Sequence, residues 1–302
     1  MERNNKHGFS PYLILALGVI GISFSAFLAR MTDAPPAIIA FWRLIFTCLL
    51  LSPLAIRDRA QFKAVCRKDL LLSLLSGLFL CLHFIFWFAS IPRTSISSAT
   101  LLVNIHPLVV VTAGWLGKEK VHLQALPWAG AALAGIALLG WSGLQMAGGV
   151  TGNILAAAGG LMLAGYYLVG RNVRPRVAIS IYSFLVYSSS ALLLLVVNLA
   201  AGNPLFSYIS SDWMVFAALA VVPTICGHTL LNWSLKYLPA SAISMGALGE
   251  PVIATILAIP LLREIPGPLQ LAGGILVIVG IAMFQKKCRS EERRVGKECR
   301  SR

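Results

Sequence analysis

Only a few ionisable side chains interrupt the long apolar stretches of this sequence. Glu250 is the one acidic residue within them, Arg43 is basic, and His83, His106 and His228 are titratable. An ionisable group inside a membrane-spanning segment costs about 2.5–3.5 kcal/mol on insertion scales. Each of these five groups therefore needs a polar partner or a hydrated cavity, and each is a candidate for function.

Glu250 lies near the middle of its apolar stretch and directly precedes Pro251. One interpretation is a carboxylate that responds to protons or cations, or that accepts hydrogen bonds from a substrate ammonium group. The other is a structural acceptor that caps backbone amides near the proline. We favour the functional interpretation slightly.

His106 precedes Pro107 in an earlier apolar stretch, just as Glu250 precedes Pro251. Each proline lacks an amide donor and leaves a carbonyl about one turn earlier without its helical partner. Such breaks are tolerated in membranes where backbone lines a cavity. We therefore expect cavity-lining breaks at both prolines, with His106 facing Glu250 or packed as a hydrogen-bonded core histidine.

Two further pairs have helical i, i+4 spacing. His83 and Trp87 share one helix face, and His228 and Asn232 share another. Facing each other, these pairs would form opposite walls of a substrate cavity, with Asn104 as a weaker candidate. The alternative is that the histidines bond across helices while Trp87 packs or belongs to an interfacial aromatic belt.

Other polar residues are expected to have lesser roles. Arg43 is expected to snorkel outward and bond carbonyls at the outer end of its helix, in a structural or gating role, with direct substrate binding less favoured. Glu119 and Glu264 lie beside basic residues at helix ends. We interpret them as members of interfacial ion pairs that form and break as the carrier changes state. Tyr166 and Tyr167 are weak candidates, because adjacent tyrosines are not expected to face inward together.

The composition explains why these residues must be positioned by membrane helices. The chain has 302 residues, of which 58% are hydrophobic and 12% charged, and its mean hydropathy is +0.80. These values exclude an ordinary soluble enzyme and a disordered chain. Six scattered cysteines give neither a disulfide framework nor metal-ligand spacing, so no cofactor or metal is expected. The net charge of +14 falls in short gaps between apolar runs, which favours lipid headgroups over nucleic acid as the anionic partner.

The apolar runs predict ten membrane-spanning helices and no extramembrane domain. Short connections hold thirteen Lys and Arg on one side against three on the other, which places both termini in the cytoplasm. The basic tail 286–302 begins with an inner-side stop, and from about residue 290 it resembles a cloning scar or, alternatively, a lipid-contacting tail. The predicted spans are 12–29, 35–56, 70–91, 94–116, 123–142, 153–170, 178–200, 213–235, 240–262 and 266–285.

The chain also matches itself at half its length, so we treat residues 1–285 as one transmembrane domain of two repeats, 12–142 and 153–285. Residues 83–110 align with residues 228–255, so that His83 matches His228 and Pro107 matches Pro251. Because each repeat has five helices, an odd number, the two halves should be inverted relative to each other. The predicted fold is thus an all-α polytopic membrane protein, and inverted repeats favour a secondary transporter with its substrate near the midplane.

Together these features resemble EamA-type members of the drug/metabolite transporter superfamily. The resemblance rests on FWR at 41–43, HP at 106–107, EP at 250–251, and the loop glutamates 119 and 264. It implies an inner-membrane carrier that exports amino acids or related metabolites, with a cavity formed mainly by helices 1, 3, 4, 6, 8 and 9. One departure is that the first half has His106 where the second has Glu250.

Two other classes of function are less favoured. The chain carries no Walker A motif, so the expected transport is not driven by ATP hydrolysis in this chain. The predicted spans hold no Asp and a single Glu, which disfavours an intramembrane enzyme. A channel would be expected to show a filter sequence. A channel-like facilitator and a multidrug efflux carrier remain alternatives. Expected partners are a small-molecule substrate, membrane lipid and coupling protons, for a monomer or homodimer.

Overall fold

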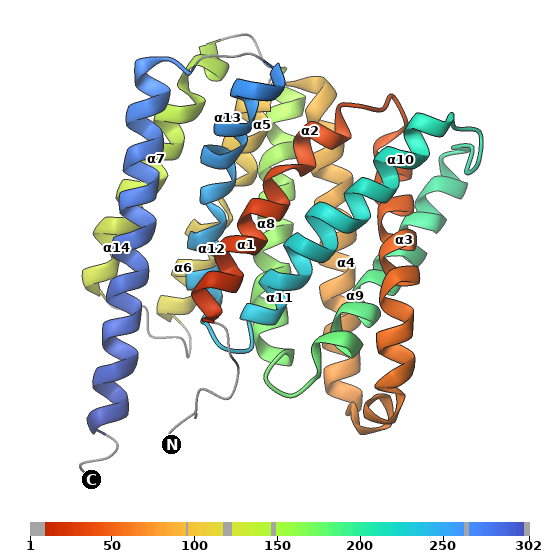
Figure 1. Ribbon diagram of the computed structural model, residues 1–302, viewed down its shortest axis with the longest axis horizontal. Coiled ribbons are helices and arrows are strands. Elements are labelled where there is room, and N and C mark those ends of the chain that lie inside the picture. The colour runs from red at the N-terminus through yellow and green to blue at the C-terminus, as the bar shows by residue number, and fades with distance from the viewer. Residues whose placement is uncertain (1–9, 95, 117–122, 146–148, 263–265, 299–302) are drawn as a thin grey trace.

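A computed structural model describes residues 10–94, 96–116, 123–145, 149–262 and 266–298. Every regular element in these ranges is helical (Figure 1). Three short 3₁₀ turns, η1 (Arg59–Ala64), η2 (Ile91–Arg93) and η3 (Leu123–Ala125), lie in the connections of the first half. The helices of the first half are α1 (Pro11–Ser23), α2 (Ser25–Ala29), α3 (Pro36–Arg57), α4 (Arg67–Ser90), α5 (Ile96–Val103), α6 (His106–Leu116) and α7 (Leu126–Gln145).

The second half begins at α8 and follows a similar order. Its helices are α8 (Val150–Val173), α9 (Ile179–Ala200), α10 (Ser210–Leu219), the π-helical segment η4 (Ala220–Thr229), α11 (Leu230–Ser234), α12 (Ala240–Ala247), α13 (Gly249–Leu262) and α14 (Pro268–Glu298). The last helix passes the predicted span end at 285 and continues into the basic tail.

Each predicted span coincides with one helix or with a run of consecutive helices. Nine segments of the described chain are long and apolar enough to cross a membrane. The tenth prediction, 123–142, corresponds to a shorter described apolar helix, Leu123–Leu139, so ten full-length spans are not established. The chain is a multi-pass membrane protein.

Two helix breaks fall where the sequence predicts them, before Pro107 and before Pro251. α5 ends at Val103, four residues before Pro107, and α12 ends at Ala247, four residues before Pro251. A third proline, Pro223, lies within the π-helical segment. The cause is the same in each case, since proline cannot donate the amide hydrogen bond that would continue the α-helix.

The two halves pack against each other. α4 lies against α8 and α9, α3 packs along α9, and α1 packs along η4. α7 and α14 pair at one edge of the bundle and share a smaller hydrophobic core with α6, α12 and α13 (Figure 1). In this pair a Cβ at Gly135 would lie 2.7 Å from the carbonyl oxygen of Gly273, so small residues bring the backbones into contact.

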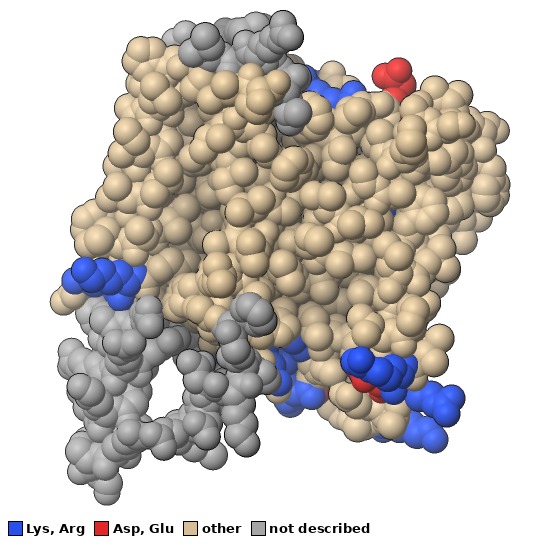
Figure 2. Space-filling model, viewed as in Figure 1, with Lys and Arg blue, Asp and Glu red and all other residues tan. Residues whose placement is uncertain are grey.

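Charged side chains concentrate at one end of the bundle. Figure 2 shows Lys and Arg mainly at the lower end, where the connection between α3 and α4 lies, and a broad band without charged residues above. The start of α1 and the end of α14 lie toward this end (Figure 1). The opposite end carries Arg30 and Arg93 among the described residues.

Candidate functional site

A narrow cavity lies at the centre of the bundle, between the two halves. Its volume is about 20 Å³, which is room for about one water molecule. α1, α2, α4 and the break after α5 contribute from the first half, and α8, η4, α12 and α13 from the second. Five of the seven predicted binding residues line it: His83, Trp87, Asn104, His228 and Glu250.

The predicted polar-aromatic faces meet at this cavity. The ring of His83 lies nearly parallel to that of Trp87, with centroids 6.2 Å apart, and its centroid is 6.4 Å from that of His228. The Nδ1 of His83 lies 2.9 Å from the carbonyl oxygen of Gly159 on α8. Because a carbonyl only accepts, Nδ1 carries the proton, and the unprotonated Nε2 is the remaining ring nitrogen.

Several polar atoms around the cavity lack a hydrogen-bond partner. Within the described chain these are Nε1 of Trp87, Oδ1 of Asn104, the hydroxyl of Tyr167 and Nδ1 of His228. All four are buried, and all four residues line the cavity. Buried polar groups in native proteins are nearly always bonded, so such a cluster points to a bound molecule that is not part of the chain.

Glu250 lies at the start of α13, directly after the helix break. Its side chain is half-buried and borders the cavity. Among the described residues, no hydrogen bond to its carboxylate is found, and no backbone amide near Pro251 is capped by it.

Arg43 does not snorkel outward, so that expectation was wrong. Its side chain is 0% exposed. Nε donates to the hydroxyl of Thr224 at 2.6 Å, Nη1 donates to the hydroxyl of Ser25 at 2.9 Å, and Cζ lies 4.4 Å from the ring centroid of Phe84. The physical reason is that the break between α1 and α2 and the π-helical segment provide hydroxyl acceptors inside the bundle.

The remaining nitrogen of Arg43 matters for the electrostatics of the cavity. Nη2 is buried and has no partner among the described residues. Ser25 and Phe84, which Arg43 contacts, both line the cavity, and its charge interacts with that of Glu250. Arg43 therefore lies behind the lining, in contact with two residues that border the cavity, while the carboxylate of Glu250 belongs to the lining itself.

His106 and Asn232 lie outside the cavity lining, unlike the other predicted binding residues. The Nδ1 of His106 lies 2.5 Å from the hydroxyl of Ser244 and joins α6 to α12, so the proposed pairing of His106 with Glu250 is not seen. Oδ1 of Asn232 accepts from the hydroxyl of Tyr166 at 2.8 Å. These hydrogen bonds join α6 to α12 and α8 to α11, and so stabilise the packing of helices around the cavity.

The expectation that adjacent tyrosines cannot both face inward was also wrong. Tyr166 and Tyr167 are each 0% exposed. Tyr167 lines the cavity, while Tyr166 lies with its ring centroid 6.2 Å from that of His228. The reason is that α8 packs against α4, α5 and α6 and also reaches α11 through Tyr166, so consecutive side chains both meet protein.

Polar contacts at the basic end join the two halves, and no motif in the sequence predicts them. Arg176 donates to both carboxylate oxygens of Asp69, with Nη2 at 2.5 Å from Oδ1 and Nε at 3.0 Å from Oδ2, which raises the pKa of Arg176. The hydroxyl of Ser180 donates to Oδ2 of Asp58 at 2.6 Å and lowers the pKa of Asp58. The predicted gating residues Glu119 and Glu264 lie outside the described residues.

Comparison with known proteins gives relatives across most of the chain. A protein of Archaeoglobus fulgidus named "Uncharacterized transporter" is 26% identical over 80% of this chain and 84% of its own length. "Uncharacterized transporter YxxF" of Bacillus subtilis is 20% identical over 93% of this chain and 91% of its own length. A solved crystal structure has a TM-score of 0.77 at 19% identity, covering 93% of this chain and 98% of the other, and shows the shared fold.

The family comparison agrees with the two halves seen in the sequence and in the packing. The model of the EamA-like transporter family matches residues 9–141 and again residues 150–285. These two segments contain the helices that line the central cavity. On this evidence the chain is a membrane transporter that belongs to the EamA-like transporter family.

Proposed function

We propose that the protein is a secondary carrier that exports small zwitterionic metabolites, amino acids among them, across the inner membrane. The observation that carries this proposal is the cluster of unpartnered polar atoms around the central cavity. Nη2 of Arg43 and Nε1 of Trp87 are donors, while Oδ1 of Asn104 and the carboxylate of Glu250 are acceptors. A small molecule that has both a carboxylate and an ammonium group could accept hydrogen bonds from these donors and donate to these acceptors.

Transport by such a carrier requires the cavity to expand and to open to one side at a time. At about 20 Å³ the cavity has no room for a metabolite, so the structure corresponds to a contracted state. The breaks between α5 and α6 and between α12 and α13 lie beside it and can absorb changes in helix direction. Inverted halves that rock about these breaks would give alternating access.

The proposed orientation has both termini in the cytoplasm of a bacterial or archaeal cell. The basic end of the bundle supports it, because Lys and Arg are enriched in cytoplasmic connections. The contacts of Arg176 with Asp69 and of Ser180 with Asp58 would then lie at the cytoplasmic end and close it.

We further propose that protons drive transport through Glu250. Among the described residues that line the cavity, Glu250 is the single carboxylate, and its charge interacts with that of the buried Arg43. Its protonation would change the charge balance of the site, so that substrate binding and proton binding compete or cooperate.

The experiment is flux of a panel of labelled amino acids in proteoliposomes, with and without a pH gradient, for the wild type and Glu250→Gln. We expect saturable flux that the gradient accelerates in the wild type and does not change in the variant. Asp33→Asn, at an exposed carboxylate away from the cavity, is the matched control and should retain the response. Equal gradient responses in wild type and Glu250→Gln would refute coupling through Glu250, and absence of flux for the whole panel would refute the substrate class.

A further inference from the structure

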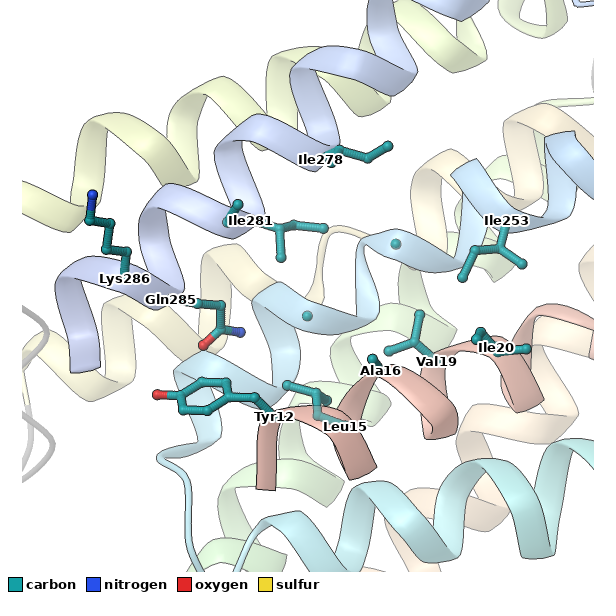
Figure 3. A pocket seen from close by; sticks show the side chains of 13 residues that line it. Tyr12, Leu15, Ala16, Val19, Ile20, Ile253, Ile278, Ile281, Gln285 and Lys286 are labelled. Carbon is teal, nitrogen blue, oxygen red and sulfur yellow. The ribbon is translucent and has the colours of Figure 1, made fainter. Parts of the chain in front are cut away.

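A second and larger hollow lies at the surface of the bundle, separate from the central cavity. Its volume is about 570 Å³, within the usual range of about 300–1,000 Å³ for ligand sites. It is formed where α1, α12 and α13 face α14 (Figure 3). Most of its lining is apolar, with Leu15, Val19, Ile253 and Ile281 among the larger side chains. We refer to it as the lateral groove.

The surroundings of the lateral groove indicate what contacts it. Two large apolar side chains of its lining are exposed: Ile20 is 45% exposed and Ile278 is 54% exposed. In a membrane-spanning helix such exposed apolar residues face hydrocarbon. The groove therefore opens toward the bilayer, where lipid acyl chains are the molecules at hand.

The polarity of the groove is uneven along its length. Tyr12, Gln285 and Lys286 gather at one end, while Ile20, Ile253 and Ile278 lie toward the other (Figure 3). The polar end is the end at which α1 begins and the apolar part of α14 stops. The apolar length of the lateral groove suits a lipid acyl chain, and the lysine at the membrane boundary suits an anionic headgroup.

The two segments that flank the described chain are too polar to fill the lateral groove. Residues 1–9, which precede α1, include Glu2, Arg3 and Lys6, and residues 289–302, which follow the described side chains of α14, are also strongly charged. Neither has the apolar run that would cover the groove. We propose that the lateral groove binds one anionic glycerophospholipid of the surrounding leaflet, with an acyl chain between α1 and α14 and its phosphate at Lys286.

The position of the groove gives such a lipid a route to influence the central cavity. α1 lines the groove with Leu15 and Val19 and lines the cavity with Ile22. Gly249 lines the groove and the next residue of α13, Glu250, lines the cavity. A lipid in the groove would contact the outer side of the wall that must move when the cavity opens.

The test is native mass spectrometry of the full chain in detergent with added palmitoyl-oleoyl phosphatidylglycerol or phosphatidylcholine. We expect one phosphatidylglycerol to be retained at several-fold higher occupancy than phosphatidylcholine of the same chains. Ala282→Trp on α14 and Ala16→Trp on α1 each place a bulky ring in the groove and should remove that lipid. Ala272→Trp, at an exposed alanine of α14 outside the groove, should retain it.

The headgroup contact is tested separately. Lys286→Gln should abolish the preference for phosphatidylglycerol, and Lys287→Gln, at the adjacent lysine that does not line the groove, should preserve it. Using two groove variants on different helices guards against a failure of one to fold. The proposal would be overturned if the two lipids bound equally, or if Ala272→Trp lost the lipid as fully as the groove variants do. It would also be overturned if both groove variants retained the lipid, or if this face held a second copy of the chain in place of lipid.

Discussion

At the residue scale, the clearest signal of function is the contrast between bonded and unbonded polar atoms. Most buried polar side chains of the described chain have partners, and Asn232 is bonded to two tyrosine hydroxyls, those of Tyr166 and Tyr187. The unbonded groups gather where both halves meet. An unbonded buried group lowers stability without benefit to the fold, so a bound water or ligand is the simplest reason for a cluster of them.

Tyr167 and Tyr166 form a matched pair for testing this contrast. Tyr167→Phe removes an unpartnered hydroxyl and should leave stability unchanged or slightly higher, while the KM for transport rises about 2- to 10-fold, the equivalent of one neutral hydrogen bond. Tyr166→Phe removes a hydroxyl bonded to Asn232 and should cost about 1–3 kcal/mol. Thermal unfolding in detergent and initial transport rates measure both. If Tyr167→Phe destabilised the protein as much as Tyr166→Phe, Tyr167 would have a structural role.

At the element scale, the position of the cavity depends on where helices break and how closely their neighbours approach. The carbonyl of Val103 lies at the end of α5, where Pro107 prevents its helical bond. A Cβ placed on Gly160 of α8 would lie 2.4 Å from this carbonyl oxygen. α8 therefore lies directly against the break, and only glycine allows that distance.

Gly160→Ala should accordingly push α8 away from the break. We expect a loss of about 1–3 kcal/mol in stability, as for other overpacked sites, together with a decrease in transport. Gly130→Ala on α7 is the control, because a Cβ there would meet nothing within 4 Å, and it should be neutral or stabilising by about 0.5–1 kcal/mol. Thermal unfolding of the two variants in the same detergent makes the comparison. Equal stability of the two variants would contradict the close packing at Val103.

At the scale of the whole molecule, the asymmetry of charge between the two ends sets the expected orientation. Cys66 is exposed at the basic end, and Met31 is 57% exposed near the opposite end. The two positions lie before α4 and after α2, at opposite ends of the bundle in Figure 1. They can report independently which end faces the cytoplasm.

Single-cysteine variants provide that report. With all other cysteines replaced, Cys66 should react with a membrane-impermeant maleimide only after the cells are opened, whereas Met31→Cys should react in intact cells. The reason is that basic connections stay in the cytoplasm during insertion. The reverse pattern would overturn the proposed orientation while leaving the fold unaffected.

The sequence by itself determined the apolar helices, the duplication and the two proline breaks. These follow from local properties, since hydrophobic runs of about 20 residues must span a bilayer and a proline cannot complete its helical bond. The sequence also predicts five residues that the structure places in the cavity lining, because burying a polar group in a membrane costs free energy unless it has a partner or lines a cavity. These residues are His83, Trp87, Asn104, His228 and Glu250.

Only the tertiary structure decided which of these polar groups share a cavity and which support it. Arg43 turns inward because hydroxyls from α2 and η4 reach it, and those contacts join residues 18 and 181 positions apart in the chain. His106 bonds Ser244 across 138 positions, so no local pattern could assign it a partner. Local sequence fixes what each helix must bury, but the partner of a buried polar group depends on packing between helices distant in the chain.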